Sequence, residues 1–228
     1  MLPLSKLVWN SVGKKFIMAL TGLAMVFFLI EHVSGNLLLF NQSNPDPYNK
    51  YSDFLLGFGE ILIVAELILV AFLLLHVFSG LSVARSKKLA RPEKYAVQGN
   101  AGGPSRKNFA SKTMIYTGLL TLVFIVIHLQ TFKYGPNYTT MTADGAEVRD
   151  LHRLVWETFR NPIYVAWYVG ALAFLFFHLR HGFWSAFQSL GVSHPRYSRL
   201  IYGLGIFLAV AVTAGFIGIP IWIYFTGA

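Results

Sequence analysis

Five long apolar stretches constrain this chain more than any other feature of its sequence. They run approximately over residues 16–40, 54–83, 113–132, 163–187 and 200–225. Each could cross the hydrocarbon core of a bilayer, about 30 Å thick, because a helix needs about 20 mostly apolar residues to do so. Hydrophobic residues make up 55% of the 228 positions, and charged residues 13%. We therefore predict an all-α membrane protein, one domain over residues 1–228 with five transmembrane helices.

The loops predict the orientation of these helices, because Lys and Arg accumulate on the cytoplasmic side of a membrane. One face carries most of the cations, namely Lys6, Lys14, Lys15, Arg85, Lys87, Lys88, Arg91, Lys94, Arg106, Lys107, Lys112, Arg180, Arg196 and Arg199. The other face carries Lys50, Lys133, Arg149, Arg153 and Arg160. We expect the N-terminus inside and the C-terminus outside the cell inner (cytoplasmic) membrane. The basic face either reflects this topology alone or also docks an acidic partner.

The longest inner loop, residues 84–112, is rich in Gly and Pro and poor in apolar residues. This composition is typical of a surface segment that a partner could order. The chain contains no cysteine, which excludes disulfides, thiolate metal sites, iron–sulphur clusters held by this chain alone and covalent c-type haem. It also has no nucleotide-binding glycine loop and no soluble domain able to bind a dicarboxylate, and we expect no nucleic-acid partner.

Four of the seven histidines lie one in each of the first four apolar stretches: His32, His76, His128 and His178. Ionisable groups inside a membrane are costly, so four at matched depths need a common explanation. A helical rise of about 1.5 Å per residue puts His32 and His128 level near the outer face. The same rise puts His76 and His178 level nearer the cytoplasm, about 10 Å away in depth.

Two level pairs of imidazoles are what two stacked bis-histidine haems require, because a porphyrin supplies four nitrogens and leaves two axial places. A zinc ion with two histidines would want carboxylates beside them. Small residues about one turn after three of the histidines would let a flat ring approach the backbone, although small residues also serve plain helix packing. These residues are Gly35, Ser79, Gly80 and Gly182.

Several segments together carry a likeness to a known family: SVGKKFIMALTGL, EHVSGNLLLF, LHVFSGLSVARSKK, VFIVIHLQ, NPIYVAWYVGALAFLFFHLRHGFWSAFQSLG and HPRYSRL. FHLRHGFWSAFQSLG is the most specific of them. With these segments the chain resembles, over nearly its whole length, the two-haem cytochrome b membrane anchor of succinate dehydrogenase and fumarate reductase complexes. The resemblance is to the single-chain, five-helix form of that subunit.

The resemblance implies that the first four helices form a bundle around two stacked b haems. It implies His32 with His128 as axial ligands of the distal haem, and His76 with His178 for the proximal one. A flavoprotein subunit with FAD and an iron–sulphur subunit would dock on the cytoplasmic face. Electrons would pass through the haems between the iron–sulphur subunit and a membrane quinone, with menaquinone typical of the two-haem type. Dicarboxylate chemistry would occur on another chain, and the complex could form higher oligomers.

Residues beyond the ligands are candidates for haem propionate or quinone contacts: Arg180, His181, Trp184 and Ser185. Alternatively, they simply sit at the level of the lipid headgroups. Quinone reduction consumes protons, so acids inside or at the ends of the spans are candidate proton partners, namely Glu66, Glu31 and Glu60. We expect Glu66 to be buried without a cation partner, either at a quinone or as a neutral acid between helices.

Two further features concern the direction of the catalysed reaction and the side of the protein at the outer face of the membrane. Phe176 stands where some quinol-oxidising fumarate reductases have a glutamate, which favours the succinate-oxidising direction. Residues 147–160 have apolar side chains at three- and four-residue steps and predict an amphipathic helix at the outer interface. That helix would cap the distal haem or a quinone pocket, or act as a membrane anchor.

Two other functions remain open at this point. One is the cytochrome b subunit of another quinone-linked oxidoreductase, such as a hydrogenase or formate dehydrogenase, which would also carry histidines in its spans. The other is a haem-free transporter whose histidines relay protons. The transporter predicts histidine pairs offset in depth and no visible absorbance.

Overall fold

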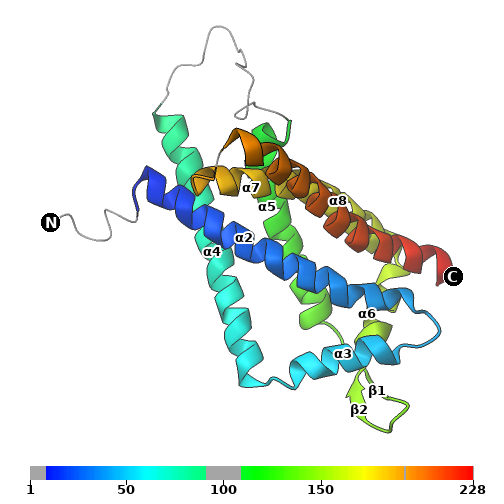
Figure 1. Ribbon diagram of the computed structural model, residues 1–228. Helices are drawn as coiled ribbons and strands as arrows, with labels where there is room; N and C mark the ends of the chain where they lie inside the picture. The colour runs from blue at the N-terminus through cyan, green and yellow to red at the C-terminus, as the bar shows by residue number, and fades with distance from the viewer. Residues whose placement is uncertain (1–8, 91–108, 193, 228) are drawn as a thin grey trace. The chain divides into compact units, whose positions relative to one another are not determined.

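The computed structural model describes residues 9–90, 109–192 and 194–227 of the chain (Figure 1). Its long helices are α2 (Ser11–Asn36), α4 (Glu60–Leu89), α5 (Phe109–His128), α7 (Pro162–Ser189) and α8 (Pro195–Thr226). A 3-10 turn, η1 (Leu37–Phe40), continues α2, and a π-helical turn, η2 (Leu129–Lys133), continues α5. With these turns, five helices are long and apolar enough to cross a membrane. The predicted all-α class and the five spans are confirmed.

Local sequence signals set where the long helices begin. The side chain of Asn10 accepts hydrogen bonds from the backbone amides of Val12 and Gly13 and caps α2. Asn161 does the same for the amide of Ile163, and Pro162 occupies the first helical position of α7. These caps satisfy backbone donors that have no partner inside a helix.

The second span begins later than predicted. Residues 54–56 belong to a separate helix, α3 (Asp46–Leu56), and α4 starts only at Glu60. Between them, Gly59 has a φ of +51°, a left-handed conformation that glycine adopts without steric cost. The turn therefore breaks an apolar run that the sequence presents as continuous.

The predicted outer helix over residues 147–160 is wrong in its first part. Glu147–Arg149 form strand β2, which pairs antiparallel with β1 (Thr139–Met141). The helix itself, α6, spans Leu151–Phe159, and the Asp150 side chain caps it by accepting from the amide of Arg153. The hairpin explains the difference, because it pairs backbone groups that the amphipathic pattern assigned to a helix.

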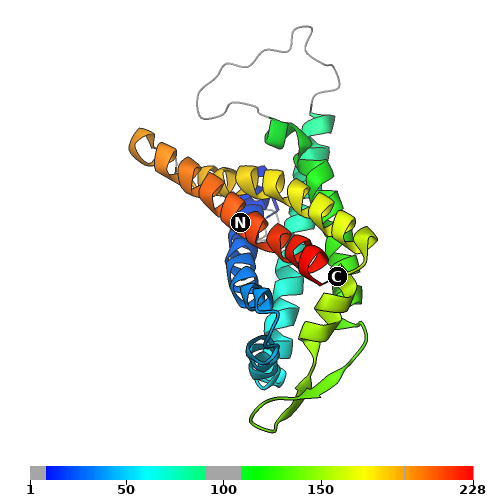
Figure 2. The ribbon, with the colours of Figure 1, turned by 90° about the vertical axis from the view of Figure 1, so that its right-hand side faces the viewer.

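Polar contacts join α3 to the hairpin and to the start of α6. The Asn49 side chain is fully buried, donates to the Asp150 carboxylate at 2.9 Å and accepts from the backbone amide of His152 at 2.9 Å. Asp46 accepts from the amide of Ala143 in the hairpin loop at 2.8 Å. In both ribbon views α3 lies beside the hairpin and α6 (Figures 1 and 2).

The chain divides into two compact units, and every long helix contributes a stretch to each. The first unit contains the described residues within Met1–Phe27, Leu69–Gly118 and Phe177–Ala209. The second contains those within Phe28–Ile68, Leu119–Phe176 and Val210–Ala228. Most of the inner loop predicted as a partner-ordered segment lies outside the described residues.

Candidate functional site: two histidine pairs

The four span histidines meet as two pairs, one in each unit. In the first unit the ring centres of His76 and His178 lie 6.2 Å apart, with 66° between the ring planes. In the second unit those of His32 and His128 lie 5.7 Å apart, with 90° between the planes. The structure therefore brings together the residues that the helical rise puts at one depth.

These separations suit one metal ion held between each pair. An imidazole–metal bond is about 2 Å long, so two bonds in line put the ring centres about 6 Å apart. Within the part of the chain that the structure describes, no three His, Asp or Glu side chains gather to hold a metal ion. The donor set is thus two imidazoles, which fits a metal that brings its equatorial ligands with it, as haem iron does.

In the first unit, a hydrogen bond to a neighbouring helix orients each histidine ring. Nδ1 of His76, on α4, lies 3.0 Å from the backbone carbonyl of Met18 on α2 and donates to it. Nδ1 of His178, on α7, lies 3.2 Å from the hydroxyl of Thr117 on α5. Both bonds occupy Nδ1 and leave Nε2 free for a metal ion, an arrangement common in metal-bound histidines.

A glycine faces each of these two rings. A Cβ added to Gly22 on α2 would lie 3.1 Å from Cε1 of His76. A Cβ added to Gly118 on α5 would lie 3.1 Å from Cε1 of His178. Such contacts are tighter than ordinary van der Waals packing, so the glycines let the imidazoles rest against the helix backbone.

The small residues predicted to leave room for a flat ring differ in their surroundings. A Cβ on Gly35 would collide with the ring of Tyr51, and one on Gly80 would approach the Met18 sulphur. Gly182 has open space around it. That prediction concerned room for a porphyrin on the helix of each histidine, whereas the glycines against the imidazoles come from the adjacent helix.

In the second unit, aromatic side chains surround the histidines. Phe28 stacks on His32 with ring centres 5.2 Å apart, and Phe124 stacks on His128 at 5.7 Å. Each Phe lies one turn before its histidine on the same helix face. The hydroxyl of Tyr168 lies 3.4 Å from Nδ1 of His128, and the π-helical turn η2 begins directly after this histidine. Such turns often occur at functional sites.

An internal repeat accounts for both pairs. The α2 segment MALTGLAMVFFLIEH, residues 18–32, matches the α5 segment MIYTGLLTLVFIVIH, residues 114–128. The α4 segment AFLLLHVFSG, residues 71–80, matches the α7 segment AFLFFHLRHG, residues 173–182. Each pair joins equivalent residues of the two copies, the relation that a two-fold axis imposes. This repeat is the signal that would have identified Gly22, Gly118 and Thr117 from the sequence.

The structure places the four candidate contact residues on the last turns of α7. Arg180 donates to the hydroxyl of Tyr202 on α8 at 2.9 Å, and Trp184 packs edge-on against the same ring. His181 and Ser185 are half-buried. In the described chain, Nε of Arg180 and the hydroxyl of Ser79 are buried without a hydrogen-bond partner. Buried polar atoms normally find partners, so these two are available to a bound group.

The prediction that Glu66 is buried without a cation partner is wrong. Its carboxylate forms an ion pair with Lys133, and its side chain is 42% exposed. Lys133 ends η2, the continuation of a different span, so the sequence did not show that the two residues meet. Glu31 and Glu60 are both exposed, and Glu60 is the first residue of α4.

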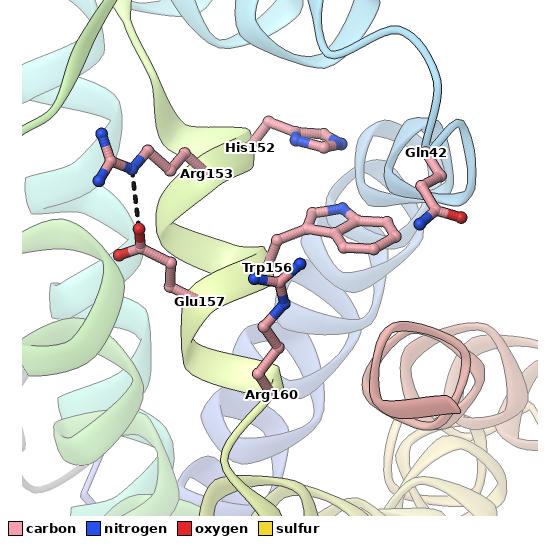
Figure 3. Close-up of a pocket in the computed structure, with 6 residues that line it drawn as sticks. All are labelled: Gln42, His152, Arg153, Trp156, Glu157 and Arg160. Carbon is pink, nitrogen blue, oxygen red and sulfur yellow. Dashed lines mark hydrogen bonds and ion pairs between the residues drawn. The ribbon is translucent and has the colours of Figure 1, made fainter. Parts of the chain in front are cut away.

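A cavity of about 420 Å³ lies beside α6 in the second unit (Figure 3). We call it the α6 pocket, and it is lined by Gln42, His152, Arg153, Trp156, Glu157 and Arg160. The rings of His152 and Trp156 stack with centres 5.4 Å apart. Arg153 and Glu157 form an ion pair at 2.8 Å. Arg160 is the other cation in the lining of the pocket.

Two buried nitrogens at the α6 pocket have no hydrogen-bond partner among the described residues: Nε2 of His152 and Nε1 of Trp156. Burial lowers the pKa of His152, although Asp150 and a hydrogen bond to the Asn41 carbonyl oppose this. The His152 ring is therefore neutral near pH 7, and its protonated nitrogen donates to the Asn41 carbonyl. The unpartnered atoms beside the pocket are thus one acceptor, His152 Nε2, and one donor, the Trp156 indole N–H, and both are covered.

Comparison of the chain with protein-family models, with curated proteins and with solved structures finds no match.

Proposed function

We propose that this chain is the membrane-anchor cytochrome b subunit of a succinate:quinone oxidoreductase, respiratory complex II. In that role it carries electrons through two bis-histidine haems between an iron–sulphur subunit and a membrane quinone. The observation that carries the proposal is the pair of ring separations, 6.2 Å and 5.7 Å, in two compact units of a membrane protein. Each separation suits one metal ion between two imidazoles.

The residues of the first unit fit a haem in two ways. His76 and His178 keep Nε2 for the metal because Nδ1 is bound elsewhere. Arg180 and Ser79 supply buried polar atoms that propionate groups could use. When bound, a haem supplies a one-electron carrier whose potential depends on its axial ligands and their hydrogen bonds. His32 and His128 would hold the second haem among aromatic side chains.

The rest of the assignment follows from the family resemblance and the charge pattern. The N-terminus would be cytoplasmic, and the flavoprotein and iron–sulphur subunits would dock on the basic cytoplasmic face. The complex would oxidise succinate or reduce fumarate on those subunits, with menaquinone as the membrane partner. This chain alone would not act on the dicarboxylate, because the resemblance puts that chemistry on another chain.

The first experiment measures haem in the purified protein together with any chains that co-purify. A dithionite-reduced minus oxidised spectrum and a pyridine haemochrome assay give the haem type and the number per chain. We expect two b haems, one lost in His178→Ala and the other lost in His128→Ala. His194→Ala is the matched control, because this exposed histidine lies outside the pairs and should leave both haems in place.

Two results would count against the proposal. A folded wild-type protein without haem would exclude any cytochrome and favour the proton-relaying transporter. Two haems that are reduced by hydrogen or formate, but not by succinate in the intact complex, would favour the other class of quinone-linked cytochrome. Reduction of the haems by succinate in a complex that contains flavin would support the subunit assignment directly.

We also propose the α6 pocket as the quinone site. Once a quinone displaces the side chains that cover them, the Trp156 indole N–H would donate to a quinone carbonyl and His152 Nε2 would exchange a proton with the reduced ring. Trp156→Phe keeps the aromatic ring and removes the donor, so we expect a higher KM for the quinone with unchanged haem content. Trp222→Phe, at an exposed tryptophan of the same unit, is the control. An unchanged KM in Trp156→Phe would place the quinone elsewhere.

A further inference from the structure

The two copies of the Met-x-x-Thr-Gly motif hold their histidines in different ways. On α2, the Thr21 hydroxyl bonds within its own helix, to the carbonyls of Ile17 at 2.7 Å and Met18 at 3.3 Å. His76 bonds to the Met18 carbonyl. The bond to the ring therefore comes from the backbone of the motif in this copy.

On α5, the hydroxyl itself reaches the imidazole. The Thr117 side chain is buried and lies 3.2 Å from Nδ1 of His178. It also lies 3.1 Å from the carbonyl of Met114 and 3.2 Å from that of Thr113. A hydroxyl has a single proton, and these carbonyls can only accept. With that proton on a carbonyl, the Thr117 oxygen accepts the proton of His178 Nδ1.

His178 therefore has a second acceptor, because the Met114 backbone also bonds to this ring. His76 has the Met18 carbonyl in the equivalent place. A hydrogen bond from the free nitrogen of a metal-bound imidazole fixes its tautomer and raises its basicity as a ligand. The second acceptor should make His178 the more electron-donating of the two rings.

We propose that Thr117 is a positioning residue for the metal-binding imidazole of His178. Its hydrogen bond makes His178 a stronger electron donor than His76, the other ligand of the first unit. Gly118, one residue later, lets the ring approach α5 closely enough for this bond. This inference rests on the proposed haem function for its effect on potential. The hydrogen bond itself belongs to the folded chain, with or without a haem.

The test compares Thr117→Val with Thr21→Val, the same substitution at the equivalent position of the other copy. Valine keeps the shape of threonine and removes the hydroxyl, which leaves His178 with the carbonyl bond that His76 has. Redox titration of the purified complex should show a higher midpoint potential for one haem in Thr117→Val and no shift for the other. Thr21→Val should shift the potentials less than Thr117→Val does, because its hydroxyl does not touch a ring and its shorter bond, 2.7 Å, is to the Ile17 carbonyl.

A second measurement does not depend on haem potential. In protein labelled with ¹⁵N-histidine and reduced with dithionite, Thr117→Val should move the Nδ1 resonance of His178, assigned by its absence in His178→Ala. Gly118→Ala should shift the same resonance and lower the haem content from two per chain toward one. Gly170→Ala should do neither, because nothing lies within 4 Å of a Cβ at that position.

The outcomes separate the inference from the proposed function. If Thr117→Val and Thr21→Val give the same potentials and the same ¹⁵N spectra, Thr117 does not position His178 and the inference fails. If the wild-type protein contains no haem, the proposed function fails, and the ¹⁵N spectra of the haem-free protein decide the inference. A larger shift in Thr117→Val than in Thr21→Val supports it in either case.

Discussion

The two histidine pairs are built from equivalent residues, yet their surroundings differ. In the first unit, hydrogen bonds from a neighbouring helix orient His76 and His178, and a glycine lies against each ring. In the second unit, phenylalanines of their own helices stack on His32 and His128. The polar contact of this second pair is that of the Tyr168 hydroxyl, which lies 3.4 Å from Nδ1 of His128.

The difference shows two ways of fixing an imidazole inside a membrane. A hydrogen bond across helices sets both the tautomer and the direction of the ring. Aromatic stacking restrains the ring plane while leaving the nitrogens less restricted. Substitutions that remove packing should therefore affect mainly the second pair, and substitutions that remove polar contacts mainly the first.

The largest expected effect comes from removing a stacking ring of the second pair. Phe124→Ala deletes the ring against His128, and large-to-small changes of this kind cost about 3 kcal/mol in a packed interior. We expect earlier thermal loss of one haem and normal retention of the other, followed by visible absorbance during heating. Phe27→Ala is the control, since this side chain is 67% exposed. Equal loss of both haems would mean that the two pairs do not differ in this way.

A smaller effect is expected from Asn49, whose buried side chain joins α3 to the start of α6 in the second unit. Asn49→Ala leaves the amide of His152 and one Asp150 oxygen without their buried partner, at a cost of about 2 kcal/mol. Hydrogen exchange should speed up at the α6 amides and stay unchanged at the first-unit end of α5. Exchange that rises throughout the protein would indicate that the units unfold together. Asn137→Ala, at an exposed position before β1, serves as the comparison.

The smallest expected effect is that of Tyr168→Phe. The contact of its hydroxyl with His128, at 3.4 Å, is near the limit for a hydrogen bond, so it contributes less than about 1 kcal/mol. We expect a shift in haem potential smaller than that of Thr117→Val, with haem content unchanged. A larger shift than in Thr117→Val would reverse the comparison and make the second pair the one governed by hydrogen bonding.

Much of the fold follows from the chain's own pattern. Apolar runs longer than a bilayer requires identify the five spans, because each span satisfies its backbone internally and needs no information from distant residues. The start of α4 was missed because a three-residue turn, ending at Gly59, interrupts the apolar run without a change in hydropathy. The strand at Glu147–Arg149 was missed because its partner, β1, lies across a loop.

In the candidate site, too, some features were predicted from the sequence and others were missed. Helical rise is a local property, so the sequence determined which histidines share a depth and therefore which ones pair. Thr117, Gly22 and Gly118 were missed, and Glu66 was misjudged, because their partners lie on other helices. Such contacts depend on how far each helix is rotated about its axis and which neighbour it packs against. The sequence by itself determined the spans and the pairing, whereas the tertiary structure decided what holds each imidazole.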